Sequence, residues 1–230
     1  VPEGSFTVGS ISDEKNDTLY WLVSGQSYDV LDIASNNTDW TGSVTMSDSI
    51  WRYTPGSIFS DTQTDGPCEA VFVDNFAISQ PNESSEISDN LAYVSPGVLA
   101  VIEQGWTVQG INSDGTMSNI TIINFINRSS GGLVFGEEFD AAVDESIDPN
   151  MGQEDSITLN TPLDLSGGYE ALIFTGPRTL NFNHGELVTG INIIDDMLFW
   201  TDNKTEPKKI NIPRSVKGTS SNGLSHTRLI

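Results

Sequence analysis

The feature that most constrains this chain is its succession of short apolar runs, each ended within a few residues by Gly, Asn, Asp, Ser or Pro. Runs of about four to eight residues between turn formers are typical of β-strands. The segment Phe139 to Ile147 is a candidate for a short helix, which Pro149 would end. The clearest strand candidates are residues 18–23, 70–73, 98–102, 120–123 and 171–174. We therefore predict an all-β fold.

A repeated order of residues occurs near both ends of the chain. Each copy has a turn, an apolar strand, a hairpin loop, an aromatic strand containing Trp and a further strand. This order is typical of a β-propeller blade. The first copy comprises residues 9–13, 19–22 and 50–53, and the second comprises 190–195, 198–202 and 209–212. We expect Trp21 and Trp200 to hold comparable positions in antiparallel sheets. A propeller needs at least about four blades, so these partial β-propeller blades would not close one alone.

The residues between the two copies have a different character. They contain Gly-rich turns and much of the acidic excess, and their order of strand, turn and strand predicts an inserted small β-barrel or β-sandwich-like domain. A long disordered loop is the alternative, which the apolar density of Val98–Ile102 and Ile120–Ile126 disfavours. Ser79 to Asn90 is polar enough for a flexible entry linker. The predicted domains are a blade segment at 1–76, the insert at 77–178 and a blade segment at 179–230.

Charge is large and unevenly distributed. Ten basic and 32 acidic residues give a net charge of −22; residues 1–177 carry −24 and residues 178–230 carry +2. Such an acidic body argues against ordinary DNA binding, which depends on Lys and Arg. It suits solubility, or a surface that nucleic acid passes without adhering. A basic group near the end favours self-association or docking to a partner over nucleic acid; its members are Lys204, Lys208, Lys209, Arg214 and Lys217.

Cofactor, metal and catalytic residues are not predicted. Cys68 is the only cysteine, which excludes an internal disulfide and, with two histidines, a Cys/His zinc cluster. No hydrolase elbow, zinc-protease motif or phosphate loop occurs. The acidic pairs Glu137-Glu138 and Asp195-Asp196 are interpreted as solvated charges rather than a glycosidase pair. The possible calcium ligands at 61–66 and 148–150 are interpreted as turn residues. No apolar run is long enough for a membrane-spanning segment.

Several strings resemble one protein family. Gly190–Ile212 resembles a segment of the stabilisation or muzzle-type tail proteins of crassvirus-like and related short-tailed bacteriophages. Gly9–Trp21, Val71–Asp74 and His226–Ile230 are similar to other stretches of the same proteins. The string Phe-Trp-Thr-Asp is also similar to lipoprotein-receptor propeller blades, but the absent cysteine-rich modules and the continuation Glu206–Ile212 favour the phage family.

The resemblance implies a non-enzymatic virion structural protein in the muzzle or nozzle region of a phage tail, assembled in the bacterial host cytoplasm. It would close the tail and give DNA a passage during ejection. The implied partners are other copies of itself in a ring, neighbouring tail proteins and passing genomic DNA without specific binding. The family proteins are much longer than 230 residues, so this chain would be a fragment of one.

Two other functions are compatible with the residues. An extracellular or virion-surface recognition module would bind host glycan or protein, with Trp40, Trp51 and Trp106 as aromatic side chains that can stack on sugars. A glycan-degrading enzyme is the third hypothesis, which the absence of a catalytic motif disfavours.

Overall fold

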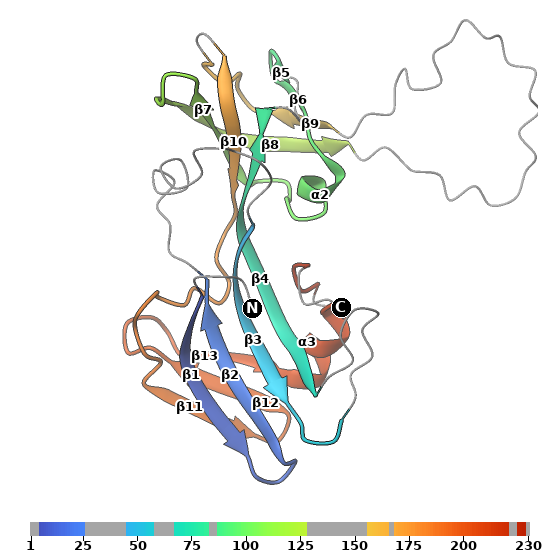
Figure 1. Ribbon diagram of the computed structural model, residues 1–230, viewed down its shortest axis with the longest axis vertical. Helices are drawn as coiled ribbons and strands as arrows, with labels where there is room; N and C mark the ends of the chain where they lie inside the picture. Colours follow the sequence, from blue (N-terminus) through green and yellow to red (C-terminus); the bar gives the residue numbers. More distant parts are fainter. Residues whose placement is uncertain are drawn as a thin grey trace, which may run out of the picture. The chain divides into compact units, whose positions relative to one another are not determined.

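The computed structural model describes residues 5–25, 45–57, 67–82, 87–127, 156–165, 168–220 and 225–228 (Figure 1). Its regular structure is predominantly β-strand, so the predicted all-β class is confirmed. The chain divides into two compact units. Unit 1 draws on Val1–Asn36, Thr45–Ile78 and Pro177–Ile230, and unit 2 is built chiefly from Ser79–Gly176.

Unit 1 contains two antiparallel sheets. In the first, strands follow the order β1-β2-β3-β4; in the second, the order is β11-β12-β13. The described strands form neither a closed barrel nor a complete propeller. The bounds are β1 Phe6–Asp13, β2 Thr18–Ser24, β3 Thr45–Tyr53, β4 Cys68–Pro81, β11 Gly190–Ile194, β12 Met197–Thr201 and β13 Lys208–Asn211. Residues of β4 beyond Ile78 belong to unit 2.

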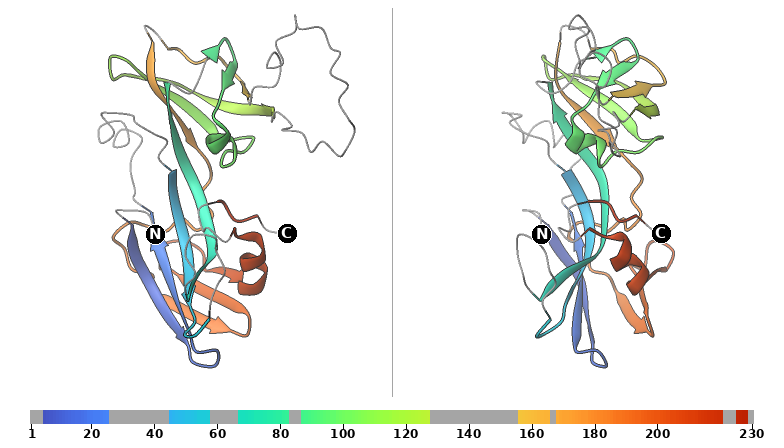
Figure 2. Two further views of the ribbon diagram at one scale, coloured as in Figure 1. Left: turned by 45° about the vertical axis from the view of Figure 1, so that its right-hand side comes forward. Right: turned by 90° about the vertical axis from the view of Figure 1, so that its right-hand side faces the viewer.

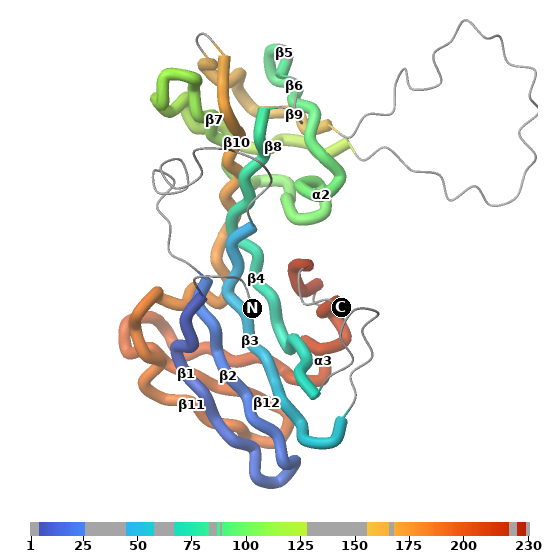
Figure 3. Tube along the Cα trace, viewed as in Figure 1, coloured from blue at the N-terminus to red at the C-terminus, as the bar shows by residue number. Residues whose placement is uncertain are grey.

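The two sheets of unit 1 lie face to face as layers (Figure 2). Because successive side chains of a strand point to opposite faces, each strand contributes alternate apolar residues to the space between the layers. The buried cluster there contains Val8, Tyr20, Leu22, Ile50, Val71, Phe72, Leu180, Phe182, Leu198, Trp200 and Ile212. The blue β1 and the orange β11 lie side by side (Figure 3), and the N–H of Val188 donates to the carbonyl of Val8 at 2.8 Å. Residues far apart in sequence thus share one core.

The two repeats correspond in strand order but not in the direction of their tryptophans. β2 lies between β1 and β3, and β12 lies between β11 and β13 in the same antiparallel order. Trp200 is 5% exposed and lies in the core, whereas Trp21 is partly exposed on the opposite face from Tyr20 and Leu22. The expectation of comparable Trp positions is therefore wrong. The buried set of β2 is displaced by one residue relative to the aligned motif, and one residue reverses the face.

A short helix and the end of the described chain complete unit 1. Helix α3, Ile212–Gly218, begins after Asn211, whose side chain accepts the N–H of Arg214, and has proline in its first turn. β13 is an edge strand, which agrees with Pro207 and Pro213 on either side of it, because proline within sheets is largely confined to edges and strand ends. Residues 225–228 then lie along β4, where Thr227 and Val73 exchange two hydrogen bonds of 2.8 Å.

The strands of unit 2 belong to a ten-stranded sheet, in which they follow the end of β4 in the order β10-β7-β8-β9-β6-β5. Its core includes Val108, Ile123, Ile157 and Leu172, each at most 1% exposed. The bounds are β5 Ile87–Ser88, β6 Leu91–Tyr93, β7 Thr107–Asn112, β8 Met117–Asn127, β9 Ser156–Leu159 and β10 Tyr169–Thr175. β8 pairs with β7 through its first part and with β9 through its second, with a bulge between Ile123 and Phe125.

Two predictions for this region are wrong. Val98–Ile102 is no strand, because its first residues belong to helix α2, Pro96–Leu99. The side chain of Ser95 accepts the N–H of Val98, and proline occupies the first turn, which together favour the start of a helix. The start of the expected linker, Ser79 and Gln80, is instead buried strand within β4. Ser95 donates its N–H to the Gln80 side chain at 2.8 Å, which satisfies a polar group that sequence alone assigns to solvent.

Candidate functional site: a buried charge network

Two aspartates lie directly opposite each other in unit 1. Asp48 on β3 and Asp74 on β4 are cross-strand partners, two residues along each strand from the core pair Ile50 and Phe72. Both are 0% exposed. Like charges directly opposite destabilise a sheet, and an ionised carboxylate is costly to bury without partners. This position therefore needs a counter-charge and hydrogen-bond donors from elsewhere in the fold.

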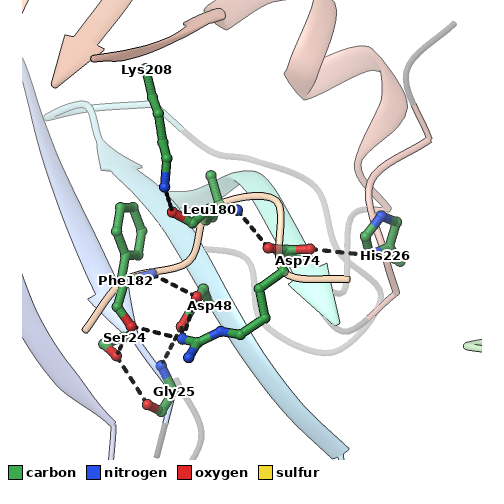
Figure 4. Close-up of polar contacts among 9 residues, drawn as sticks. Ser24, Gly25, Asp48, Asp74, Leu180, Phe182, Lys208 and His226 are labelled. Atoms are coloured by element: carbon green, nitrogen blue, oxygen red, sulfur yellow. Dashed lines mark hydrogen bonds and ion pairs between the residues drawn. The ribbon is translucent and has the colours of Figure 1, made fainter. Parts of the chain in front are cut away.

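Arg178 and the residues after it supply them. Its Nη2 donates to both oxygens of Asp48, at 2.9 and 2.7 Å, and to the carbonyl of Phe182 at 2.7 Å. The N–H groups of Gly25 and Phe182 donate to Asp48 at 3.0 and 2.9 Å (Figure 4). Burial raises the pKa of the Asp48 carboxyl, while the Arg178 guanidinium and the two N–H donors oppose that shift. The guanidinium also lies 4.2 Å from the centroid of the Phe76 ring, within cation–π range.

Asp74 is less completely satisfied. Its Oδ2 accepts the N–H of Leu180 at 2.6 Å, whereas Oδ1 is buried with no hydrogen-bond partner among the described residues. The Nδ1 of His226 is 3.9 Å from that oxygen (Figure 4). This nitrogen already accepts the N–H of Asn75 at 3.1 Å, so it carries no proton in this arrangement. Burial raises the pKa of Asp74, opposed by the Leu180 N–H and by the Arg178 guanidinium.

The network fastens several segments to one another. The side chains of Leu180 and Phe182 belong to the core, while their backbone groups meet the two carboxylates. Nζ of Lys208 on β13 donates to the Leu180 carbonyl at 2.6 Å, and Oγ of Ser24 on β2 donates to the Phe182 carbonyl at 3.0 Å. Both sheets are thereby tied to the segment that holds Arg178. The carboxylates are enclosed and largely occupied by donors, so this arrangement supports cohesion rather than acid–base chemistry on a substrate.

The acidic pair singled out in the sequence lies elsewhere in unit 1. Asp195 and Asp196 form the exposed turn between β11 and β12, where Asp195 has a φ of 52°. They line a cavity of about 400 Å³ together with Asp13 and Arg52. Asp196 and Asp195 therefore share an opening with the β1–β2 hairpin. Within the described ranges no three His, Cys, Asp or Glu residues are grouped to hold a metal ion.

The other residues considered in the sequence analysis do not join this network or lie outside the described residues. Glu137, Glu138, Trp40 and the turns at 61–66 and 148–150 lie outside them. Trp106 is 4% exposed, and its indole fills the space beside Gly176, where an added Cβ would meet it at 2.1 Å. It is a packing residue of unit 2 and is closed to a sugar. Trp51 is partly exposed on β3.

Sequence reasoning did not single out the charge network. Asp48 stands among Ser and Met in a strand that resembles a half-solvated one, and Arg178 lies 130 residues away. Asp74 offered the better signal, because it directly follows the apolar run Ala70–Val73. An acid within such a run is expected to need a buried partner, but the pattern names none.

No family model, curated protein or solved structure matches this chain significantly. Among the described residues, no helix is long and apolar enough to cross a membrane. What the protein does is therefore inferred from its own residues and their arrangement.

Proposed function

We propose that this chain is a non-catalytic structural protein of a phage tail, from a propeller-containing component of the muzzle or nozzle region. Copies of it surround the DNA passage, together with neighbouring tail proteins, and DNA passes without being bound specifically. The chain is assembled into the virion in the bacterial cytoplasm. The observation that carries the proposal is the convergence, in unit 1, of every string that resembles that family.

The converging strings come from distant parts of the sequence. Gly9–Trp21 forms β1 and the start of β2, Val71–Asp74 lies in β4, and Gly190–Ile212 contains the whole β11–β12–β13 sheet. The described part of His226–Ile230 bonds to β4 at Val73 and Asn75. Four chance resemblances would have no reason to lie together in the fold. Because these four strings all belong to unit 1, they support the proposal that the unit comes from that family.

The buried charges support a structural role. An enzyme needs its acid or base within reach of a substrate, and the two buried carboxylates of unit 1 are enclosed. Their network instead joins both sheets, as suits a part that transmits load within an assembly. The net charge of −22 supports passage of DNA without adhesion, because like charges repel over a Debye length of about 8 Å at physiological salt.

The propeller and insert assignments belong to this proposal. Two antiparallel meanders packed face to face are the arrangement of neighbouring blades, and also that of a β-sandwich. Unit 2, mostly Ser79–Gly176, takes the place of the predicted insert. Additional blades from the rest of a longer chain, or from other copies, would complete the ring.

The test is to locate the chain in a particle. Purified virions of a phage that encodes it should contain the chain in a fixed copy number, and cryo-electron microscopy should show the two sheets of unit 1 in tail density around the channel. Absence of the chain from purified particles, or density on the capsid instead, would refute the proposal. Amber mutation of its gene should yield particles with incomplete tails that lose DNA.

A second candidate, glycan or protein recognition, is favoured by one observation. Trp21 and Trp51 are cross-strand partners on the outer face of the first sheet, and both are partly exposed. The Trp51 indole N–H donates to Oγ of Ser49, two residues back on its own strand, at 2.9 Å. The indole therefore lies along β3 and is placed to present a face for stacking. Saturable binding on a glycan array, abolished by Trp51→Ala, would support this function.

A further inference from the structure

Positive charge is segregated at the end of this sequence. Residues 207–230 contain five Lys or Arg residues and no Asp or Glu, a balance of +5. Residues 1–206 hold the other five basic residues and all 32 acidic ones, a balance of −27. A charge distribution this uneven creates a local field opposite in sign to that of the rest of the surface.

The fold collects part of this charge on one exposed face. Arg214 and Lys217 are both exposed and lie three residues apart on α3, which places them on neighbouring positions of one helical face. Arg228 is also exposed, and its N–H donates to the carbonyl of Gly218 at 2.9 Å, immediately beyond Lys217. We call Arg214, Lys217 and Arg228 the basic face.

The backbone under the basic face is held in place. Thr219 Oγ1 lies 2.7 Å from Oγ1 of Thr227 and donates to the carbonyl of Val71 at 3.0 Å. A Cβ added to Gly218 would meet the carbonyl oxygen of Arg228 at 2.0 Å, so the two backbones approach as closely as glycine permits. The backbone that carries these cations is therefore fixed, and little of its conformational entropy is lost when a partner binds.

We infer that the basic face docks on the acidic surface of a second copy of this chain. The inference deepens the proposed function, in which copies adjoin one another. Charge complementarity favours a second copy as the partner, because each copy has both a basic face and a far larger acidic surface. Because the two surfaces differ, the contact is heterologous, and it forms a ring when the rotation between copies closes.

Double-stranded DNA is the competing occupant, and the surroundings disfavour it. The basic face comprises three cations on a molecule of net charge −22, whereas phosphate binding depends on many contacts that together outweigh repulsion. Acidic residues also lie close by in the fold: Asp195 and Asp196 line the same cavity as Ile212 and Pro213, at the start of α3. An approaching phosphate backbone meets these carboxylates, whereas a protein partner can accommodate them.

The test compares two charge reversals in the full chain. Sedimentation velocity over a concentration series, at about 0.1 M and about 1 M salt, measures association where the Debye length is about 10 Å and about 3 Å. We expect the unaltered chain to self-associate at the lower salt concentration. At the higher concentration its self-association should be at least about tenfold weaker, because salt screens exposed charge pairs. Arg214→Glu with Lys217→Glu should reduce low-salt self-association at least about tenfold. The matched control is Lys204→Glu with Lys209→Glu, which makes the same charge change outside the basic face.

Mixing separates loss of the face from loss of folding. The double variant at 214 and 217 keeps its acidic surface, so a labelled sample should still bind the unaltered chain while failing to bind itself. A monomer at both salts, or equal weakening by the control pair, would overturn the inference. Binding of a 20-base-pair duplex by the unaltered chain, lost in the 214/217 variant (fluorescence anisotropy, about 0.1 M salt), would assign the face to DNA instead. These measurements use the purified chain and need no virion. The docking inference can therefore fail while the proposed tail location is correct, and the tail location can fail while the docking inference is correct.

Discussion

The two units bury polar side chains of different kinds. Unit 1 buries the carboxylates of Asp48 and Asp74, with Arg178 between the strands and the surface. Among the described residues of unit 2 the buried polar side chains are neutral; they are Ser79, Gln80, Asn112, Ser118, Thr121 and Ser156. Gln80 there accepts the N–H of Ser95, and Ser118 accepts that of Gly110. Unit 1 thus depends on charge compensation, and unit 2 on hydrogen bonds that carry no net charge.

This difference predicts which substitutions should destabilise each unit most. Removing one partner of a buried ion pair leaves an uncompensated charge, whereas removing one partner of a neutral bond leaves only an unsatisfied dipole. A substitution in the network of unit 1 should therefore cost more than a comparable one in unit 2, and only unit 1 should respond to protonation of buried groups.

The largest effect is expected from Arg178→Met. This change leaves two buried carboxylates opposite each other without their guanidinium, at a cost of about 3 to 5 kcal/mol in the free energy of unfolding. Urea unfolding, followed by hydrogen exchange of β3 and β4 amides, measures it. The control is Lys204→Met, which removes a cation from an exposed pair with Glu186 and should change the free energy of unfolding far less, because water screens that pair. Equal costs for both variants would show that the buried network is not what stabilises unit 1.

The two aspartates themselves should differ. Asp48→Asn leaves Arg178 without its bidentate partner, and is expected to cost about 2 kcal/mol more than Asp74→Asn. Asn at 74 can still accept the Leu180 N–H while removing one of two facing charges. Parallel denaturation curves give the comparison. If the variant at 74 proves the less stable one, Asp74 rather than Asp48 is the carboxylate on which the stability of the network depends.

In unit 2, Gln80→Leu should have an intermediate effect. Gln80 is 0% exposed, and without its side-chain oxygen the Ser95 N–H loses its acceptor at the start of α2. The expected loss is about 1 to 3 kcal/mol, with little dependence on pH because no buried charge changes. Hydrogen exchange near β6 and α2 measures it. A loss that grew with pH would contradict the neutral character assigned to this unit.

The smallest effect is a pH dependence confined to unit 1. Burial raises the folded-state pKa of Asp48 and Asp74 above the unfolded value of about 3.9, so the folded state holds protons more tightly. This contribution to stability is fully present below about pH 3.9 and is lost as pH rises through the raised values. Partly exposed Asp202, with its pKa lowered to about 2, acts in the opposite sense below about pH 3.9.

Measurement of this trend uses the amides of β3 and β4 from about pH 4 upward, because the loss begins at the unfolded pKa. Their opening free energy should fall slightly with rising pH, by about 1.4 kcal/mol for each unit of pKa difference at most. Asp74→Asn should flatten the slope, while unit 2 amides should show none. A slope of the opposite sign would mean that Arg178 and the N–H donors outweigh burial.

Local patterns were sufficient for much of the fold. Alternating and apolar runs identified β2, β4, β8 and β10, because a strand between turn formers needs few distant contacts to be recognised. The prolines that flank β13, Pro207 and Pro213, are likewise a local signal for the edge position that this strand occupies. The failure at Val98–Ile102 was also local: the Ser-Pro start of a helix was present in the sequence and outweighs a short apolar run.

What the sequence by itself determined is the β class, the separation of charge and the strands with strong patterns. Only the tertiary structure decided which face of each strand is covered, since Trp21 and Trp200 occupy similar strings and point to opposite sides of their sheets. It also decided that Asp48 is buried, because the residues that enclose it, Arg178 to Phe182, follow about 130 positions later. An aspartate in a polar stretch is stable in water; it becomes part of a core only where a distant segment brings the cation and donors that replace water.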